Sequence, residues 1–271
     1  MFRLCREVRF NLDPCPDDDW IVYGENSFGG KPPALGGKRP KRGGGFRLRH
    51  YLMLRATLTG AELPKYGYLR NIKEVDVALR DRSLPIIAQF VRENTFGGGC
   101  GVLRAVFDDV RDIFPDTPVT DMELVLSPTC RLSIDRETPT MVKLTQAFEF
   151  AAGHRLHNPD LSHEENLKMF GKCNNPHIHG HNYQVEVTVA GEPDENGLVM
   201  DLNDLERIVG QTIIDEFDHK NLNVEVEEFQ TLNPSVENIS KVVYERLTAV
   251  LPKLHKVRVW ETPKTWCEYG G

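Results

Sequence analysis

The sequence lacks a cysteine framework and any paired Cys-x-x-Cys motif. Its six cysteines are scattered at positions 5, 15, 100, 130, 173 and 267 among 271 residues. Small secreted domains that depend on disulfides carry dense, closely spaced cysteines, so the pattern excludes that class of protein. The cysteines are instead typical of free thiols in a reducing compartment.

Long apolar runs are absent as well. No segment is long enough to cross a bilayer, and residues 1–6 lack the apolar centre of a signal peptide. We therefore expect a cytoplasmic protein with no membrane partner. The hydrophobic content of 40% and the charged content of 27% are those of a soluble globular protein. The length is sufficient for two domains, each with its own core.

An excess of positive charge is also missing, because the formal net charge is -7. This argues against a general nucleic-acid binder. Residues 1–137 contain 21 Lys and Arg against 19 Asp and Glu, whereas the remainder contains 12 against 21. An anionic substrate in the acidic half would need local cations, for which Arg155, Lys168 and Lys172 are candidates. A basic, glycine-rich loop at residues 28–45 could contact phosphate or nucleic acid, although such loops are more often simply mobile.

Residues 171–183 bring a thiol and three imidazoles together. Side chains alternate along a strand, so His179 and His181 project from one face, which continues as the apolar valines of residues 185–189. An isolated pair of this kind is more often a hydrogen-bonded surface feature. It could also bind one metal, and catalytic zinc usually takes three protein ligands. The best candidate for the third ligand is His154, at the end of another alternating strand.

Three further features favour a catalytic site. Cys173 alone would more often be an inert buried thiol, but beside a metal it could lose its proton near neutral pH. Asp218 and His219 are adjacent after a predicted helix, where a histidine can simply complement the helix dipole. Glu261 follows an apolar strand, a position where a solvated acid is the ordinary explanation.

Together these motifs resemble the 6-pyruvoyltetrahydropterin synthases, most closely their eukaryotic-type branch. The motifs are His154-Arg155-Leu156-His157, Ser162-His163-Glu164-Glu165-Asn166-Leu167-Lys168, Phe170-Gly171-Lys172-Cys173-Asn174-Asn175-Pro176, His179-Gly180-His181-Asn182-Tyr183, Asp218-His219-Lys220-Asn221-Leu222 and Glu261-Thr262. They stand in family order and cover about the last half of the chain, from roughly Thr138 onward.

The resemblance implies one Zn²⁺ cofactor on His154, His179 and His181. It also implies a catalytic thiol at Cys173, which works with Asp218 and His219.

The resemblance further implies that Glu261 anchors the pterin ring, with more substrate contacts at Ser235 and Glu237. At two places the sequence departs from the family pattern in residues expected to affect substrate binding. His177 and Ile178 stand where the family usually has a small polar residue or glycine. The family's Thr-Thr-Glu-Asn becomes Ser235-Val236-Glu237-Asn238, so one pterin-facing hydroxyl is missing.

The pattern of elements predicts an α+β fold in two tandem units. Each half reads strand, strand, helix, helix, strand, strand, which describes a four-stranded antiparallel sheet with two helices on one face. The expected apolar helix stripes are Ile72, Val75 and Leu79, then Val102, Val106, Val110 and Ile113, and in the second half Leu202, Leu205 and Val209, then Ile239, Val243, Leu247 and Val250. The resemblance identifies this unit as the tunnelling fold, whose members close such sheets into a β-barrel across subunits. We therefore expect a homo-oligomer.

The first half lacks the residues of the candidate site. Aligning the two halves puts Arg47 and Arg49 at the positions of His179 and His181. The same comparison puts Pro14 at His154 and Leu126 at Glu261. We predict a degenerate, non-catalytic tunnelling-fold repeat over residues 1–137 and a catalytic domain over residues 138–271.

The leading hypothesis, implied by the resemblance, is a zinc-dependent lyase of tetrahydrobiopterin biosynthesis. It would convert 7,8-dihydroneopterin triphosphate to 6-pyruvoyltetrahydropterin with loss of triphosphate. One alternative is 6-carboxytetrahydropterin synthase of the queuosine pathway, which loses the side chain as acetaldehyde. Others are a pterin- or metal-binding protein without turnover, which the thiol and the Asp-His pair disfavour, and a nucleic-acid-binding module at residues 38–42, which the net charge disfavours.

Overall fold

The computed structural model describes residues 1–12, 23–25, 50–92 and 98–270. Its internal contacts divide the chain into two units, which we describe separately. Unit 1 comprises Met1–Leu144 and Gly191–Val199, and unit 2 comprises Thr145–Ala190 and Met200–Gly271. The domain boundary expected after residue 137 stays a prediction. Among the described helices, none combines the length and apolar character that crossing a membrane would require.

Unit 1 contains an antiparallel sheet in the order β2-β1-β3-β4-β5. Its strands are β1 (Phe2–Leu12), β2 (Tyr23–Glu25), β3 (His50–Gly60), β4 (Val119–Val125) and β5 (Cys130–Asp135). The register places Val8 opposite Leu54, Leu54 opposite Leu124, and Leu124 opposite Leu132. All four are buried, so one apolar row crosses four strands and fixes the register.

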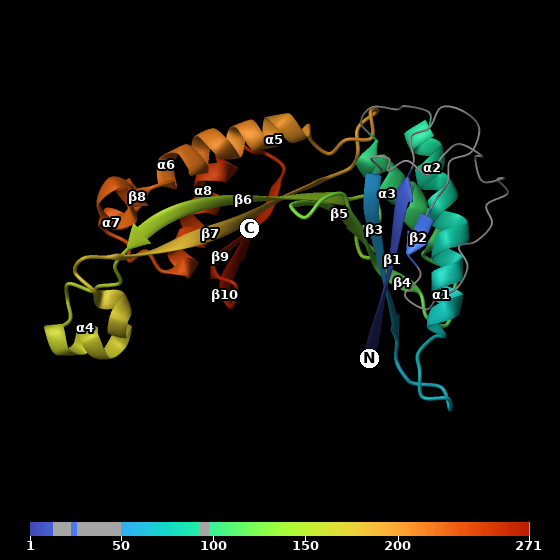
Figure 1. The fold of residues 1–271 in the computed structure, drawn as a ribbon, viewed down its shortest axis with the longest axis horizontal. Helices are drawn as coiled ribbons and strands as arrows, with labels where there is room; N and C mark the ends of the chain where they lie inside the picture. The colour runs from blue at the N-terminus through green and yellow to red at the C-terminus, as the bar shows by residue number, and fades with distance from the viewer. Residues whose placement is uncertain (13–22, 26–49, 93–97, 271) are drawn as a thin grey trace, which may run out of the picture. The chain divides into compact units, whose positions relative to one another are not determined.

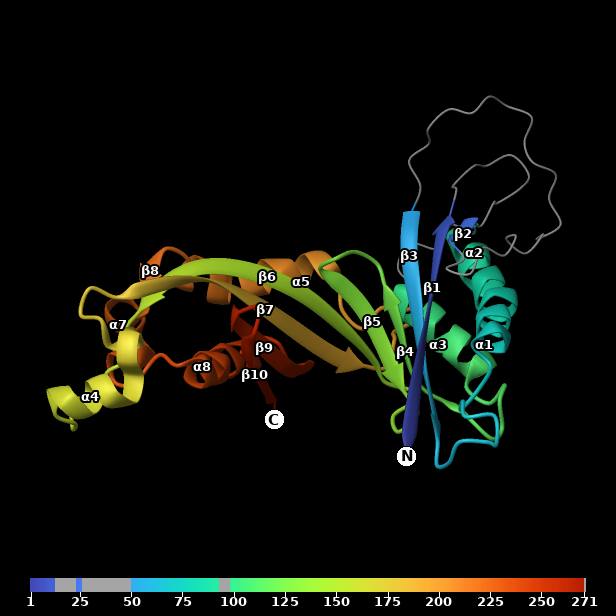
Figure 2. The same ribbon diagram turned by 60° about the horizontal axis from the view of Figure 1, so that its bottom comes forward.

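The helices of unit 1 cover one face of this sheet (Figures 1 and 2). They are α1 (Ile72–Ala78), the π-helical η1 (Leu79–Ser83), α2 (Leu84–Arg92) and α3 (Gly99–Val110). The Asn71 side chain caps α1 by accepting from the Lys73 N–H. In α3, Leu103, Val106 and Val110 are fully buried and supply much of the core.

Unit 2 contains a sheet in the order β10-β9-β7-β6. Its strands are β6 (Val142–His154), β7 (His179–Gly191), β9 (Leu254–Thr262) and β10 (Thr265–Gly270), with the short β8 (Lys220–Asn221) parallel to the end of β6. Tyr183, Val185, Val187 and Val189 are fully buried, which confirms the apolar face predicted for this strand. The chain is therefore α+β with antiparallel sheets, as predicted.

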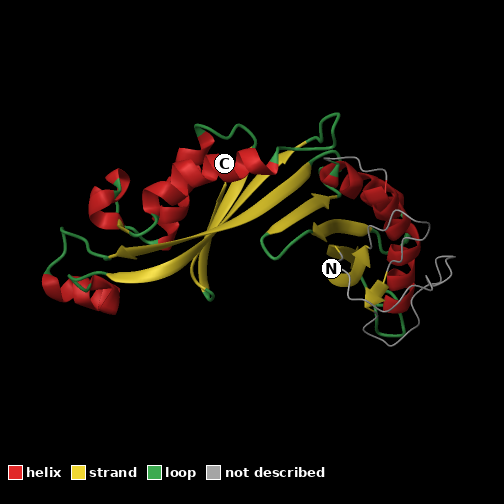
Figure 3. Cartoon of the chain, turned by 45° about the horizontal axis from the view of Figure 1, so that its top comes forward, coloured by secondary structure: helices red, strands yellow, loops and turns green. Residues whose placement is uncertain are grey.

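The longer helices of unit 2 run along its strands (Figure 3). The helical segments are α4 (His163–Phe170), η2 (Gly171–Asn174), α5 (Leu202–Val209), η3 (Gly210–Ile214), α6 (Asp215–Phe217), α7 (Leu222–Glu225), η4 (Glu227–Gln230) and α8 (Val236–Thr248). Helix α8 packs on β9 and β10. Helix α4 follows the end of β6, where a capping box of Ser162 and Glu165 starts it.

Two residues of the predicted apolar stripes were assigned wrongly. Leu202 is 38% exposed because it is the first residue of α5, directly after the capping Asp201, where the helix has not yet turned toward the core. Val250 is 48% exposed because α8 ends at Thr248, so the following turn carries its side chain off the stripe. The stripe residues between them, Leu205, Val209, Ile239, Val243 and Leu247, are fully buried.

Several sequence predictions fall outside the described residues. These are the basic loop at residues 28–45, with its phosphate or nucleic-acid hypothesis at residues 38–42, and the positions Pro14, Arg47 and Arg49. Leu126, which the alignment matches to Glu261, is described and follows β4 with its side chain partly exposed.

Candidate active site

Three imidazoles converge at one end of the unit 2 sheet. His154 ends β6, whereas His179 and His181 begin β7, so both strands deliver their histidines to the same edge. The candidate ligand atoms of the three lie within 4.8 Å of one another, and Nε2 of His154 is 3.0 Å from Nε2 of His179. A tetrahedral zinc with bonds of about 2.05 Å holds two ligand nitrogens about 3.3 Å apart. The three ring nitrogens therefore lie close enough together to bind one metal ion.

A backbone carbonyl group fixes the orientation of the His154 ring. Its side chain is 0% exposed, and its Nδ1 lies 2.7 Å from the carbonyl oxygen of Pro234. A carbonyl can only accept, so Nδ1 carries the proton and the lone pair of Nε2 faces the other histidines. Such a partner on the far ring nitrogen is usual for histidines that bind metals. The Tyr183 hydroxyl lies 3.4 Å from the same Nδ1.

The sequence assigned neither residue this supporting role, although Tyr183 ends the His179–Tyr183 motif. Tyr183 could have been found, because it is the next inward-facing residue after His181 on β7. Pro234 lies 80 residues from His154 and contributes only its backbone, so its side chain offers no sequence signal.

The pKa values of His154 and His179 are lowered, which favours the neutral imidazole that binds metal ions. Burial lowers the pKa of His154 to about 4; the hydrogen bond to Pro234 opposes this shift, and the neighbouring histidines add to it. Burial and His181 also lower the pKa of His179, against the opposing charge of Glu261. The buried Nε2 of His181 has no hydrogen-bond partner among the described residues. An unpaired ring nitrogen beside two neutral imidazoles fits a zinc ion.

Glu261 lies beside the three histidines. Its Oε1 is 3.3 Å from Nε2 of His154 and 3.6 Å from Nε2 of His181. Glu261 reaches this position because of the register of β7 and β9. The register pairs Gln184 with Trp260 and so places the following residue, Glu261, beside the start of β7. The site therefore has an acid that can accept N–H groups at the edge of the histidine cluster.

Asp218 and His219 form a second cluster, attached to β6 through Ala151. One Asp218 carboxylate oxygen accepts from the Ala151 N–H at 2.8 Å, and the other accepts from Nδ1 of His219 at 2.8 Å. The His219 N–H donates to the Ala151 carbonyl at 2.6 Å. The hydrogen bond from Ala151, followed by that from His219, lowers the pKa of Asp218. The ionised acid therefore fixes the His219 tautomer and leaves its Nε2 available for proton exchange.

A cavity of about 640 Å³ connects the two clusters. Its walls include His181 and the 83% exposed His219 side chain, together with Ala151, Ala152, Gly153, Ile178, Gly180, Asn182, Lys220, Asn221 and Glu225. His181 and His219 thus face one space, which could hold a small molecule between a metal and a proton-transfer group.

Cys173 lies in η2, which joins α4 to β7. The Leu156 N–H donates to the Cys173 carbonyl at 2.8 Å, and Asn174 accepts from Arg155, so this segment is attached directly after His154. In the described part of the chain, no hydrogen bond joins the half-exposed thiol to Asp218 or His219. The structure brings Cys173 toward the end of the sheet without direct contact to that pair.

The two residues predicted to contact substrate, Ser235 and Glu237, lie at the start of α8. The Ser235 hydroxyl caps α8 by accepting from the Asn238 N–H at 3.4 Å, and Ser235 follows the Pro234 that holds His154. Glu237 is exposed in the first turn of the same helix. Their contacts with substrate stay predictions.

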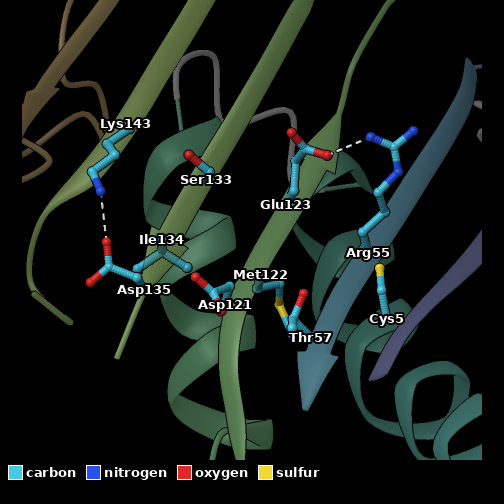
Figure 4. Close-up of a pocket in the computed structure, with 10 residues that line it drawn as sticks. All are labelled: Cys5, Arg55, Thr57, Asp121, Met122, Glu123, Ser133, Ile134, Asp135 and Lys143. Carbon is cyan, nitrogen blue, oxygen red and sulfur yellow. Dashed lines mark hydrogen bonds and ion pairs between the residues drawn. The ribbon is translucent and has the colours of Figure 1, made fainter. Parts of the chain in front are cut away.

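A different cavity, of about 300 Å³, lies on the unit 1 sheet (Figure 4). Its charged walls are ion-paired, since Arg55 bonds Glu123 at 2.6 Å and Lys143 bonds Asp135 at 2.7 Å. These charges neutralise each other, and no histidine lines the cavity. This cavity therefore lacks the imidazoles that gather in unit 2.

Comparison with known proteins agrees with this location. The family model for 6-pyruvoyl tetrahydropterin synthase matches residues 143–271. The human 6-pyruvoyl tetrahydrobiopterin synthase is 45% identical over 132 residues, which are 48% of this chain and 91% of the human protein. The 6-carboxy-5,6,7,8-tetrahydropterin synthase of Haemophilus influenzae is 29% identical over 151 residues, 48% of this chain and 99% of that protein. A solved 6-pyruvoyl tetrahydropterin synthase from Caenorhabditis elegans is 40% identical, with a TM-score of 0.47, and covers 48% of this chain and 96% of its own.

Proposed function

Since this chain belongs to the 6-pyruvoyl tetrahydropterin synthase family of lyases, we propose that it converts 7,8-dihydroneopterin triphosphate to 6-pyruvoyltetrahydropterin in a zinc-dependent reaction. The observation that carries the proposal is the convergence of His154, His179 and His181 within the matched residues. The 45% identity over 132 residues to a pyruvoyl enzyme, against 40% over 91 residues to a putative carboxy enzyme and 29% over 151 residues to another carboxy enzyme, favours the pyruvoyl reaction.

The three histidines would hold the metal through ring nitrogens that lie close together, and the lowered pKa values of His154 and His179 favour the neutral form. Bound zinc would supply Lewis-acid chemistry, which acidifies the C–H bonds next to the side-chain oxygens of the substrate. His154 keeps its tautomer through Pro234, so its lone pair stays directed into the site.

Proton transfer is assigned to Cys173 together with Asp218 and His219. The thiolate would remove a proton from one side-chain carbon and return it to another, while triphosphate departs with the electron pair of its C–O bond. No external oxidant is needed, because the side chain is rearranged internally. The ionised Asp218 keeps His219 oriented toward the cavity that it shares with His181.

Glu261 is proposed to anchor the pterin ring by accepting its N–H groups, with Ser235 and Glu237 as further contacts. We expect Glu261→Gln to keep its metal but to bind substrate more weakly, because the amide retains the shape and loses the negative charge. A titration of a zinc-loaded sample with substrate measures the change in Kd. An unchanged Kd would mean that the carboxylate at the histidines does not anchor the ring.

The product of the reaction tests the proposal as a whole. Purified protein with zinc and 7,8-dihydroneopterin triphosphate should release triphosphate and form a pterin that keeps all three side-chain carbons. Mass spectrometry separates this product from the 6-carboxy compound, whose formation would release acetaldehyde. Detection of the carboxy product would select the queuosine-pathway alternative, and the absence of both products would select a non-catalytic pterin- or metal-binding protein.

We also propose that residues 1–137 are a degenerate copy of the catalytic unit at residues 138–271. Both units order their four main strands alike, as β1-β3-β4-β5 and as β6-β7-β9-β10. Equivalent features support the proposal: left-handed glycines at Gly67 and Gly197, helix caps at Asn71 and Asp201, and π-helical segments at Leu79–Ser83 and Gly210–Ile214. The tunnelling fold further implies a barrel formed by several copies, so light scattering should give a molar mass above the 30.8 kDa of one chain.

A further inference from the structure

We propose that the turn at residues 64–68 of one chain docks on the first turn of α8 in a second copy of this chain. The contact would bring two exposed tyrosines of unit 1 beside Ser235 and Glu237, the proposed substrate contacts. The inference rests on one part of the proposed function, because it takes residues 1–137 as a copy of the catalytic unit.

A contact of this kind exists within unit 1. Residues Gly191–Val199 belong to this unit, although they join β7 to α5 in the sequence. The Gly197 carbonyl accepts from the Gly101 N–H, in the first turn of α3, at 3.1 Å. A Cβ at Gly197 would lie 2.7 Å from Cα of Gly98, the N-cap residue of α3. The turn that carries Gly197 therefore lies directly against the start of a helix.

The corresponding turn of the first copy has the same geometry. The Gly67 N–H donates to the Pro64 carbonyl at 2.8 Å, and the Gly197 N–H donates to the Asp194 carbonyl in the same way, at 2.9 Å. Both glycines are left-handed, with φ of +77° and +71°. An added Cβ at Gly67, however, would meet no described atom within 4 Å. The turn at Gly67 thus repeats the conformation of a docked turn, while its own surface is open.

Aromatic side chains make this open surface apolar. Tyr66 is 69% exposed and Tyr68 is 51% exposed, and their rings stack with centroids 6.3 Å apart. Leu63, directly before the turn, is also exposed. The docked turn carries Asn196 and the half-buried Leu198 at the positions of the two tyrosines. Tyrosine is enriched at protein interfaces, so the exposed rings favour a protein partner.

Helix α8 is the element of the catalytic unit that corresponds to α3. Each helix packs on the last two strands of its unit, α3 on β4 and β5, and α8 on β9 and β10. Gly98 is the N-cap residue of α3 and Ser235 that of α8. Each stands four residues before the first buried residue of the apolar stripe, which is Val102 in α3 and Ile239 in α8. The start of α8 is therefore equivalent to the surface that Gly197 contacts.

The charges of the turn and of α8 are complementary. Lys65 stands on the turn where the docked turn has Glu195, and its ammonium lies over the Tyr66 ring at 5.0 Å. The first turn of α8 contains the exposed Glu237, whereas the first turn of α3 contains no acid. A basic turn against an acidic helix start favours this pairing of surfaces. The Glu237 carboxylate has two oxygens, so it can accept from substrate and from Lys65.

The contact with α8 would be wider than the one with α3. Asn238 stands three residues after Ser235, where α3 has Gly101, and a Cβ at Gly101 would lie 3.3 Å from Cα of Gly197. The second copy would therefore approach α8 less closely than Gly197 approaches α3. Pro234, which holds His154, directly precedes this surface, so the docked tyrosines would cover the substrate site from one side.

The test joins two different chains through the proposed contact. Full-length Tyr68→Cys and full-length Glu237→Cys are co-expressed with different affinity tags, and mixed assemblies are treated with a short bis-maleimide. The sample should give a covalent dimer with twice the 30.8 kDa mass of one chain. Each variant expressed alone should give only the background from the native cysteines.

Val77→Cys paired with Glu237→Cys is the matched control, since Val77 is 55% exposed on α1 of the same unit and lies outside the turn. This pair should give background only. Sedimentation at decreasing protein concentration provides a second measurement. The double variant Tyr66→Ala, Tyr68→Ala should dissociate at a concentration about tenfold or more above that of wild type, the usual cost of removing aromatic anchors from an interface.

The outcomes separate this inference from the proposed reaction. A crosslink confined to the Tyr68, Glu237 pair, together with weaker association of the double tyrosine variant, supports the contact. A wild-type protein that stays a single chain at every concentration overturns it, as does a crosslink no stronger than that of the control pair. Failure of the wild type to release triphosphate would overturn the reaction and leave the contact standing.

Discussion

Cys173→Ala is expected to fold and to bind zinc like the wild type while its turnover falls by roughly two to four orders of magnitude. This is the usual cost of removing a positioned proton-transfer group. The fold should survive because the thiol is half-exposed, and the segment is attached through its backbone to Leu156 and through Asn174 to Arg155. The measurement is kcat on 7,8-dihydroneopterin triphosphate, with zinc content and circular dichroism on the same sample.

Cys267→Ala is the matched control for this prediction. Cys267 lies on β10 of the same unit, and its thiol donates to the neighbouring Glu268 carbonyl at 3.8 Å, away from the histidine cluster in sequence and without a hydrogen bond to it among the described residues. Its removal should leave kcat unchanged. If Cys173→Ala retained near-normal kcat, the proton would have to be carried by His219 or by metal-bound water, and the role assigned to the thiol would be wrong.

The sequence was sufficient to predict the core of the candidate site, because strand alternation is a local rule. His179, His181 and the buried valines after them follow one periodicity, and His154 ends another strand. Both strands belong to one antiparallel sheet, so their histidines meet at the same end. The α+β class followed in the same way from the order of strands and helices.

The parts that could not be predicted depend on contacts between distant segments. Pro234 holds His154 through a backbone carbonyl, and β8 joins Asp218 and His219 to β6 through a parallel pair that no side-chain pattern indicates. The position of Glu261 depends on the register of β7 against β9. Helix ends were another source of error, since Leu202 and Val250 fit the period of a helix but lie where each helix starts or stops.

Ile178 illustrates a different limit. The sequence shows an isoleucine where the resembling family has a small polar residue or glycine, but not the left-handed backbone that the turn imposes. The structure adds that this isoleucine lines the cavity that His181 and His219 share.

The double variant His179→Ala, His181→Ala is expected to lose its metal. Wild-type protein should contain one zinc per chain on His154, His179 and His181, and the variant would retain only His154, one ligand where catalytic zinc uses three. Turnover should fall to background with it. The fold should remain, because the two side chains are only half-buried at the start of β7, ahead of the fully buried Tyr183 and Val185. Metal analysis by mass spectrometry gives the stoichiometry directly.

His163→Ala, His177→Ala serves as the matched control, since it removes two exposed imidazoles from the same region of the chain and leaves the three converging ones intact. Its zinc content should remain at one per chain. Two zinc ions per wild-type chain, or full metal content in the His179, His181 variant, would contradict the assignment. In that case the histidine pair would be a hydrogen-bonded feature of the strand. The position of the Glu261 carboxylate beside the histidines would then have a cause other than metal binding.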